Sequence, residues 1–296
     1  MDRKPQLRAG QVLRNKYRID GVISTHGGFG DVYEAWDNED HRRVAVKYAF
    51  QDLKIEQFKN EALILTRNAT DLPFIPDVYA HWRSRDGKGY FIVMEYVEGD
   101  TLDNVNPLPW SVQEVDHFLK RLLENLHDLH SRNPPIIHCD IKPDNIKKTL
   151  KKSLSVSIPY KILDFGIARW GNAEPLQAWT PPYAAPEQYP ELPLEIDTRT
   201  DLYSLAATAY YLLTGQKPPD AEERYNQVVR RDNVDPLQSP SSILRGRTIP
   251  LVLEQTLIAM LTPDPNGRPR SAEEALYRLE QRTSSQVMPP PKKGIG

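Results

Sequence analysis

The sequence predicts a bilobal α+β protein, in which a small antiparallel sheet with one helix precedes a larger, mainly helical lobe. Three observations lead to this prediction. Apolar segments near residues 17–19, 32–36 and 44–47 are joined by connections too short for helical crossovers, which favours an antiparallel meander. Beyond residue 110, apolar residues recur mostly at helical spacing. A chain of 296 residues is long enough for one large or two ordinary domains.

Composition is typical of a water-soluble globular protein, with 39% hydrophobic and 26% charged residues. A net charge of −2 provides no basic field that would favour nucleic acid or an anionic membrane, so we expect neither partner. The single cysteine, Cys139, excludes an intrachain disulfide and suits a reducing compartment. The N-terminus lacks the apolar core of a signal peptide, and the most apolar stretch, 204–213, is shorter than the ~20 residues of a membrane span. We therefore expect a cytoplasmic protein.

The first lobe is expected over residues 17–94, after a polar lead-in at 1–16. Its three strands are followed by a helix at 52–68 and by two more strands near 79–82 and 89–94. The helix is indicated by apolar residues three and four apart, namely Ile55, Phe58, Ala62 and Leu65.

A connector at 95–99 leads to the second lobe, residues 100–282. Its first helix is expected to begin at Ser111, because Ser111 and Glu114 match the Ser-x-x-Glu capping box. Further helices are expected at 197–213, 221–231, 251–261 and 271–282. The tail 283–296 has no periodicity and is expected to be disordered.

Residues 138–145, HCDIKPDN, are the segment around which the chain is organised. Asp140 and Asn145 share this short loop, and Asp164 follows in the sequence DFG. One carboxylate near a hydroxyl, with two further oxygen ligands for Mg²⁺ beside it, is a layout suited to phosphoryl transfer.

The order of HxDxKPxxN and DFG resembles the eukaryotic-type (Hanks-type) serine/threonine protein kinase family, and the chain is similar to its bacterial members. The resemblance covers residues 17–282. It implies the protein kinase fold, with ATP and Mg²⁺ as cofactors and Mn²⁺ as an alternative ion. It also implies transfer of the ATP γ-phosphoryl to Ser or Thr hydroxyls of a protein substrate.

The resemblance implies a role for each residue of the loop. Asp140 would accept or orient the proton of the attacking hydroxyl, and Lys142, typical of the serine/threonine form, would contact the transferred phosphoryl. Asn145 and Asp164 would hold the metal ion. His138 would be a buried support, as would Phe165.

A similar assignment follows for Lys47, which ends the apolar strand 44–47. A strand-edge lysine reaching water is the simpler interpretation. The resemblance instead implies that Lys47 binds the α- and β-phosphates and pairs with Glu61 on the next helix. Glu56 is the fallback partner, although a solvated helix charge is its ordinary interpretation.

The segment 25–30 aligns with GxGxxG, although Thr25 replaces the first glycine. Alone, such a cluster is typical of a hairpin turn, but its place upstream of Lys47 favours phosphate binding. The nucleotide contacts implied by the resemblance are Thr25, Gly27, Gly28, Gly30, Val32, Ala45, Lys47, Met94, Glu95, Val97 and Lys147.

Segment 95–99 would be the hinge that holds the adenine edge, through the backbone of Glu95 and Val97. Met94 would be the gatekeeper. Lys147 stands where the family usually has Leu, so we expect its methylene stem to pack on the adenine while its ammonium reaches solvent.

Cys139 stands where most family members have an Arg that grips a phosphate on the activation loop. Residues 164–187 contain only Thr180 and Tyr183 as hydroxyl residues. We therefore expect a non-RD kinase that is active without activation-loop phosphorylation. Cys139 is interpreted as a packed thiol, with a redox role as the alternative.

Three further expectations concern the second lobe and its insert. Glu187, in the APE segment 185–187, is expected to pair with Arg268, and Asp201 to anchor the catalytic loop. The Lys-rich segment 146–160, which includes Lys151 and Lys152, is expected to be a solvated hairpin, with a docking site for an acidic partner as the alternative.

Two other functions stay open. A pseudokinase that binds ATP as a scaffold is supported by Thr25, Cys139 and Lys147, whereas a small-molecule kinase could share the layout of Asp140 and Asn145. The sequence does not predict the substrate, the upstream signal, the oligomeric state or whether the chain belongs to a longer protein.

Overall fold

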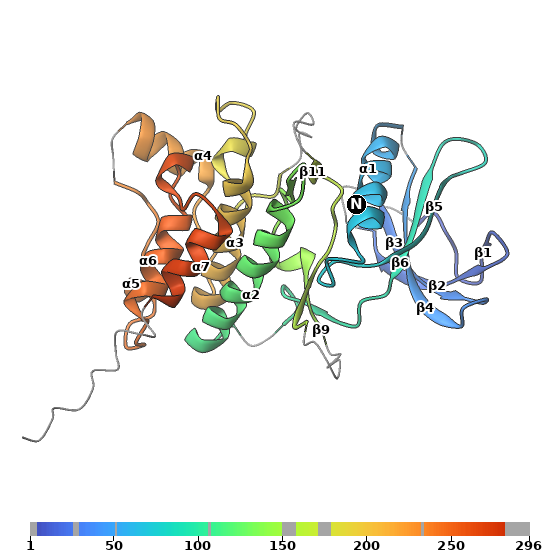
Figure 1. The fold of residues 1–296 in the computed structure, drawn as a ribbon, viewed down its shortest axis with the longest axis horizontal. Helices are drawn as coiled ribbons and strands as arrows, with labels where there is room; N and C mark the ends of the chain where they lie inside the picture. The colour runs from blue at the N-terminus through green and yellow to red at the C-terminus, as the bar shows by residue number, and fades with distance from the viewer. Residues whose placement is uncertain are drawn as a thin grey trace, which may run out of the picture. The chain divides into compact units, whose positions relative to one another are not determined.

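A six-stranded antiparallel sheet is the framework of the first part of the chain in this computed structural model (Figure 1). The structure describes residues 5–25, 30–50, 52–105, 108–149, 158–170, 179–231 and 234–281. The strands follow the order β1-β2-β3-β4-β6-β5. Their bounds are β1 Val12–Leu13, β2 Tyr17–Ser24, β3 Asp31–Asp37, β4 Arg42–Ala49, β5 Val78–Arg83 and β6 Tyr90–Glu95. The five strands predicted from the sequence are all present.

Helix α1 (Asp52–Asn68) packs against β4, β5 and β6, within the bounds predicted for it. Its apolar residues Phe58 and Ala62 join Ala49 and Ile92 in one core cluster on this face of the sheet. Because side chains alternate along a strand, this face also receives Lys47 from β4. The Lys47 side chain therefore lies on the face of the sheet that α1 covers.

The N-terminal segment differs from the predicted polar lead-in. It contains β1, which pairs with β2, and its Leu7 and Leu13 are buried in a second core cluster with Tyr33 and Val46. Two isolated leucines in a polar stretch show no periodicity, and they are buried only because the sheet supplies an apolar face.

Short strands frame the predicted catalytic loop. They are β7 Gly99–Thr101, β8 Ile136–Ile137, β9 Ile146–Thr149, β10 Tyr160–Ile162 and β11 Arg169–Trp170. β9 pairs with both β7 and β10, and β8 pairs with β11. The β9–β10 pairing provides the two strands of the predicted hairpin, while Lys151 and Lys152 lie outside the described residues.

Helices make up most of the second part of the chain. They are α2 Val112–His130, α3 Thr198–Thr214, α4 Ala221–Tyr225, α5 Pro240–Ile243, α6 Leu251–Met260 and α7 Ala272–Glu280, with 3₁₀ turns at Pro143–Asn145, Pro186–Gln188 and Pro265–Gly267 and a π-turn at Asn226–Arg230. α2 packs on α3 and α7, and α6 packs on the same two helices.

The start of α2 follows the predicted capping chemistry, whereas that of α7 has only half of a capping box. Ser111 and Glu114 form a complete capping box at α2, and Asp197 caps α3. At α7 the Ser271 side chain accepts from the Glu274 N–H, but the Glu274 carboxylate accepts from Arg270 N–H instead of from Ser271. The tail 283–296 lies outside the described residues.

The chain packs as two compact units. One consists of Met1–Asn106 with Asn133–Ala178, and the other of Pro107–Arg132 with Trp179–Gly296. The predicted catalytic loop 138–145 therefore packs in the same unit as the sheet, while α2 to α7 form the other unit. Within the described ranges, we find no helix with the length and apolar content needed to cross a membrane.

Candidate active site

Lys47 lies at the centre of a buried charge cluster. Its Nζ is 2.8 Å from both oxygens of Glu61 and 2.6 Å from Oδ1 of Asp164. The Lys47 side chain is 6% exposed and that of Glu61 is 1% exposed. The predicted pairing of Lys47 with Glu61 is confirmed, while Glu56 is an exposed partner of Lys59. Helix α1 thus presents Glu61 directly to Lys47 near the end of β4.

The charges in this cluster are unequal, because two carboxylates share one ammonium. Burial raises the pKa of Glu61 to about 7, although Lys47 opposes the rise. For Asp164 burial acts in the same sense, but the Lys47 ammonium outweighs it and lowers the pKa of this carboxyl. Burial would lower the pKa of Lys47, and the two carboxylates reverse that effect. The excess negative charge favours a further cation beside Asp164.

The loop residues form a second cluster around Asp140. Its Oδ2 accepts hydrogen bonds from Lys142 Nζ and from Asn145 Nδ2, each at 2.8 Å. Asn145 Nδ2 also donates to the Asp140 carbonyl at 2.9 Å. The 3₁₀ turn Pro143–Asn145 brings Asn145 back over Asp140. The sequence therefore places a carboxylate, an ammonium and an amide within one hydrogen-bonded group.

His138 ties this loop to the strand that precedes Asp164. Its Nδ1 accepts the Asp140 N–H at 3.2 Å, so Nε2 carries the proton and donates to the Leu163 carbonyl at 2.9 Å. The Leu163 N–H in turn donates to the Asn145 carbonyl at 2.7 Å. His138 is fully buried and meets Phe165 edge-on at 4.6 Å between ring centroids. These contacts agree with the supporting roles expected for both residues.

Asn145 and Asp164 fit a magnesium ion by their donor atoms. Within the described residues, Asn145 hydrogen-bonds through Nδ2 and Asp164 through Oδ1, so Asn145 Oδ1 and Asp164 Oδ2 accept no hydrogen bond there. Among those residues there is no group of three or more acidic, His or Cys side chains that could hold a metal alone. Mg²⁺ usually takes one or two protein oxygens and completes its shell with water and phosphate.

Two non-glycine residues at this site have left-handed backbone. Cys139 has φ 63° and Asp164 has φ 57°. Such conformations cost roughly 1–3 kcal/mol each and occur most often at functional sites. Here one of them is Asp164 itself, and the other, Cys139, directly precedes Asp140.

The predicted phosphate-binding turn is described only at its edges. Gly27 and Gly28 lie outside the described residues, whereas Thr25 and Gly30 lie inside. Gly30 has φ 141°, and a Cβ there would lie 2.5 Å from the Tyr48 carbonyl oxygen and 2.7 Å from the Phe58 ring. Only glycine fits this position.

The residues predicted to surround adenine lie on adjacent strands. Val32 pairs with Lys47, and Ala45 pairs with Met94. Val32 and Met94 are partly buried, and Ala45 is buried. This register brings Val32 and Ala45, predicted to cover one face of adenine, next to the predicted gatekeeper Met94 and the predicted phosphate-binding Lys47 on one sheet.

Lys147 makes a contact that the sequence did not predict. Its side chain is partly buried, and its ammonium donates to the Val97 carbonyl at 2.9 Å and lies 5.4 Å from the centre of the Tyr96 ring. The reason is the pairing of β9 with β7, which lays Lys147 along the hinge. The predicted packing of its stem on adenine stays a prediction.

A sequence model of the family described as "Protein kinase domain" matches residues 23–278. The chain belongs to the protein kinase family. Family membership implies the use of ATP and a divalent metal ion, and it accounts for the sheet lobe and helical lobe of this kinase domain.

Three curated relatives of the kinase domain are bacterial proteins. A serine/threonine-protein kinase of Myxococcus xanthus is 30% identical over 89% of this chain and 32% of its own length. PknA of Nostoc sp. is 34% identical over 72% of this chain and 39% of its own. PknB of Mycobacterium leprae is 30% identical over 95% of this chain and 45% of its own. The chain spans less than half the length of these three relatives.

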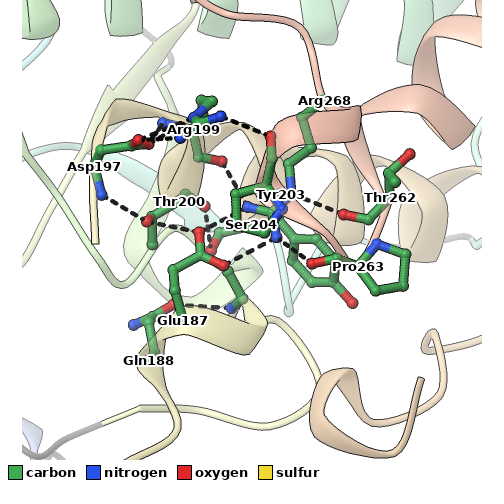
Figure 2. Close-up of polar contacts among 12 residues, drawn as sticks. Glu187, Gln188, Asp197, Arg199, Thr200, Tyr203, Ser204, Thr262, Pro263 and Arg268 are labelled. Carbon is green, nitrogen blue, oxygen red and sulfur yellow. Dashed lines mark hydrogen bonds and ion pairs between the residues drawn. The ribbon is translucent and has the colours of Figure 1, made fainter. Parts of the chain in front are cut away.

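The predicted pair of Glu187 and Arg268 is present in the helical unit of the kinase domain (Figure 2). Arg268 Nη1 and Nη2 lie 2.7 and 2.9 Å from the two Glu187 oxygens, and both side chains are fully buried. Thr200 Oγ1 donates to Glu187 at 2.8 Å. Asp201, also fully buried, accepts from His130 Nε2 at 2.9 Å. Its expected contact with the catalytic loop stays a prediction.

Sequence reasoning missed two residues that support the site. Lys161, three positions before Asp164, donates to the Glu95 carboxylate and to the Ile75 carbonyl. Asn60 Nδ2 donates to the Ala168 carbonyl at 3.2 Å, which ties α1 to the segment after DFG. The available sequence signal was position alone: Asn60 directly precedes Glu61, and Lys161 lies shortly before the DFG segment.

Proposed function

We propose that this kinase domain transfers the γ-phosphoryl of ATP to Ser or Thr hydroxyls of protein substrates. The observation that carries the proposal is the hydrogen-bonded group of Asp140, Lys142 and Asn145, joined through Leu163 to the cluster of Asp164 and Lys47. Lys142, which is typical of the serine/threonine form of the loop, supports hydroxyl acceptors of this kind. The names of the relatives support the same choice.

The nucleotide would be held by residues of the sheet unit. Lys47 would bind its α- and β-phosphates, and the turn that ends at Gly30, where Tyr48 and Phe58 leave no room for a Cβ, would lie beside them. The backbone of Glu95 and Val97 would hold the adenine edge, with Val32 against one face. We place the lobes at 17–94 and 100–282, with 95–99 as the hinge.

The metal would be held by Asn145 Oδ1 and Asp164 Oδ2, the two oxygens that the described chain leaves without a hydrogen bond. We favour Mg²⁺, with Mn²⁺ as the alternative ion, because both ligands are hard oxygens. When bound, the ion would neutralise phosphate charge. Lys47 would then exchange its contact with Asp164 for the phosphates while Glu61 keeps it in place.

The chemical step would rest on positioning. Asp140 Oδ2 is held between Lys142 and Asn145, so its carboxylate has a defined direction in which to orient the substrate hydroxyl and accept its proton. Lys142, which is bonded to the same carboxylate, would share the charge of the transferred phosphoryl group. Each residue has its place before substrate binds, which keeps the reorganisation small.

Regulation would not depend on a phosphorylated activation loop. Cys139 is buried, with its Sγ 3.7 Å from the Ile137 carbonyl, and a thiol carries no positive charge for a phosphate. A buried, reduced thiol as the sole cysteine also supports a cytoplasmic location.

The function is tested with labelled ATP, Mg²⁺ and generic protein substrates. We expect Asp140→Asn and Lys47→Met to lower phosphoryl transfer by a factor on the order of 100 or more. Asp144→Asn and Lys59→Met are matched controls, because both side chains are exposed and lie on the same loop and on α1.

Each contrary outcome points to a different function. Retained ATP binding without transfer by the wild type would favour a scaffold, and label found only on metabolites would favour a small-molecule kinase. Equal activity of wild type and Asp140→Asn would refute the assignment of the site.

A further inference from the structure

Lys147 is the feature of the nucleotide site that its proposed function does not explain. It sits on β9, two residues after Asn145, and its Nζ donates to the main-chain carbonyl of Val97 at 2.9 Å. The carbonyl belongs to the hinge itself. One of the polar groups that a hinge offers to a ligand is therefore already occupied by a side chain of the protein.

The surroundings hold the ammonium in this position. Burial lowers the pKa of Lys147, with Asp100 opposing the change, so the charged form depends on a nearby acceptor. The Val97 carbonyl supplies it, and the Tyr96 ring lies 5.4 Å away. The other face-on cation at Tyr96 is Arg43, at 4.8 Å, which itself pairs with Glu34 at 3.1 Å.

The backbone also fixes the approach. Lys147 pairs with Thr101 in the β7–β9 ladder, and the Leu102 N–H donates to the Ile146 carbonyl at 3.0 Å. At Gly99 a Cβ would lie 2.0 Å from the Lys148 carbonyl oxygen, so the strands are closer than other residues allow. The lysine is thus anchored at both ends, by its strand and by its ammonium.

The chemistry of purines shows what this contact would do. Adenine carries along one edge an N6–H donor, the N1 acceptor and then a carbon-bound hydrogen at position 2. In the proposed hinge, Glu95 and Val97 meet the first two groups, and the Val97 carbonyl is the next polar group along the backbone. Adenine needs nothing from it, whereas a 2-amino group is a donor that would compete with Lys147 for this carbonyl and meet a cation.

We propose that Lys147 is a specificity residue that selects purines without a 2-amino group, by occupying the Val97 carbonyl with its own ammonium. The inference rests on the proposed nucleotide site and deepens it. The simpler alternative is that Lys147 only supports the packing of β9 against the hinge, in which case its removal would weaken the binding of all nucleotides equally.

The test compares Mg²⁺-bound ATP with the triphosphate of 2,6-diaminopurine riboside, by titration calorimetry on the full chain. We expect wild type to bind ATP more tightly, and Lys147→Met to reduce this preference by roughly threefold to tenfold, the worth of one hydrogen bond. Lys147→Leu is the second variant. Lys148→Met is the matched control, because Lys148 is the exposed neighbour on the same strand, and we expect it to keep the wild-type ratio.

The outcomes separate this inference from the proposed function. An unchanged ratio in folded Lys147→Met and Lys147→Leu, or equal binding of both nucleotides by wild type, would overturn the role of Lys147. A ratio that shifts as expected in a protein that transfers no phosphoryl group would support it while the proposed function fails. A wild type that binds neither nucleotide would overturn both.

Discussion

Arg268 makes full use of its guanidinium inside the helical unit (Figure 2). Its five N–H groups reach Glu187 twice and the carbonyls of Thr262, Pro263 and Arg199, at 2.7 to 3.1 Å. The Tyr203 ring lies 4.9 Å from it. With every donor paired, the desolvation of the charge is offset, and the residue joins three separate segments at one point.

We expect Arg268→Ala to lower the free energy of unfolding by about 3–5 kcal/mol, because it leaves the Glu187 carboxylate buried without its partner. Arg278→Ala is the matched control: Arg278 pairs with Glu274 on the exposed side of α7 and should contribute only about 0.5 kcal/mol. Urea unfolding of both variants measures the difference. Similar losses in the two variants would contradict the role given to burial.

At the same scale, the double substitution Glu187→Leu with Arg268→Met separates charge from packing. Since both charges leave together, we expect it to be more stable than Arg268→Ala alone.

The Glu187–Arg268 pair was predictable because each residue belongs to a short sequence motif that the family resemblance assigns to this pair. The three carbonyl contacts were not, because a sequence does not show which backbone oxygens a turn leaves exposed.

Among the elements, the N-terminal segment has a larger part than its composition suggests. Tyr33 Oη accepts the N–H groups of Gln6 and Leu7, at 2.9 and 3.0 Å, and donates to Asp31 Oδ2 at 2.9 Å. Burial raises the pKa of Tyr33 to about 12. One hydroxyl therefore fastens the segment to β3, the strand that follows the predicted phosphate-binding turn.

We expect Tyr33→Phe to lower the free energy of unfolding by about 1–3 kcal/mol, since the Leu7 N–H loses its acceptor and the Gln6 N–H keeps only its 3.2 Å bond to Asp31 Oδ2. Tyr277→Phe is the control, as Tyr277 is 60% exposed, and it should stay within about 0.5 kcal/mol of wild type. Hydrogen exchange at Gln6 and Leu7 gives a second measurement. Unchanged protection of both amides in Tyr33→Phe would count against the anchoring role.

The elements also show where sequence reasoning succeeds. Helices α1, α2 and α3 were predictable because spacing and capping act within a few residues, as at Ser111 and Asp197. β1 was not, because a two-residue strand exists only through its partner, β2. The burial of Leu7 likewise depends on the apolar face of the completed sheet, which its own segment does not reveal.

In the whole molecule, the predicted catalytic and nucleotide-binding residues that are described, from Thr25 to Asp164, fall within one compact unit. These residues could be predicted from the order of the motifs along the chain, because each motif lies on a short turn or at a strand end, where the local backbone fixes its side chains. The ammonium of Lys147 on Val97 could not be predicted, because it depends on two strands that are distant in sequence and meet in register.

Regulation belongs to this scale as well, since a phosphorylation switch needs both a loop residue and a cation to receive it. Cys139 offers the catalytic loop no such cation. Of the hydroxyl residues between 164 and 187, Thr180 has its carbonyl bonded to the N–H groups of Tyr183 and Ala184, at 2.9 and 3.1 Å. Thr180 thus already has a place in the turn that precedes Glu187.

We expect the enzyme to transfer phosphoryl groups at the same rate before and after treatment with a phosphatase, because the residue immediately before Asp140 is Cys139, which cannot bind a loop phosphate as an arginine would. Peptide mass spectrometry on the active preparation measures the occupancy of Thr180 and Tyr183, and a mock-treated sample controls for losses during handling. Neither position should need phosphate for activity. A stoichiometric phosphate on Thr180 whose removal abolishes transfer would show that the switch operates without the arginine, and that Cys139 does not determine how this kinase is controlled.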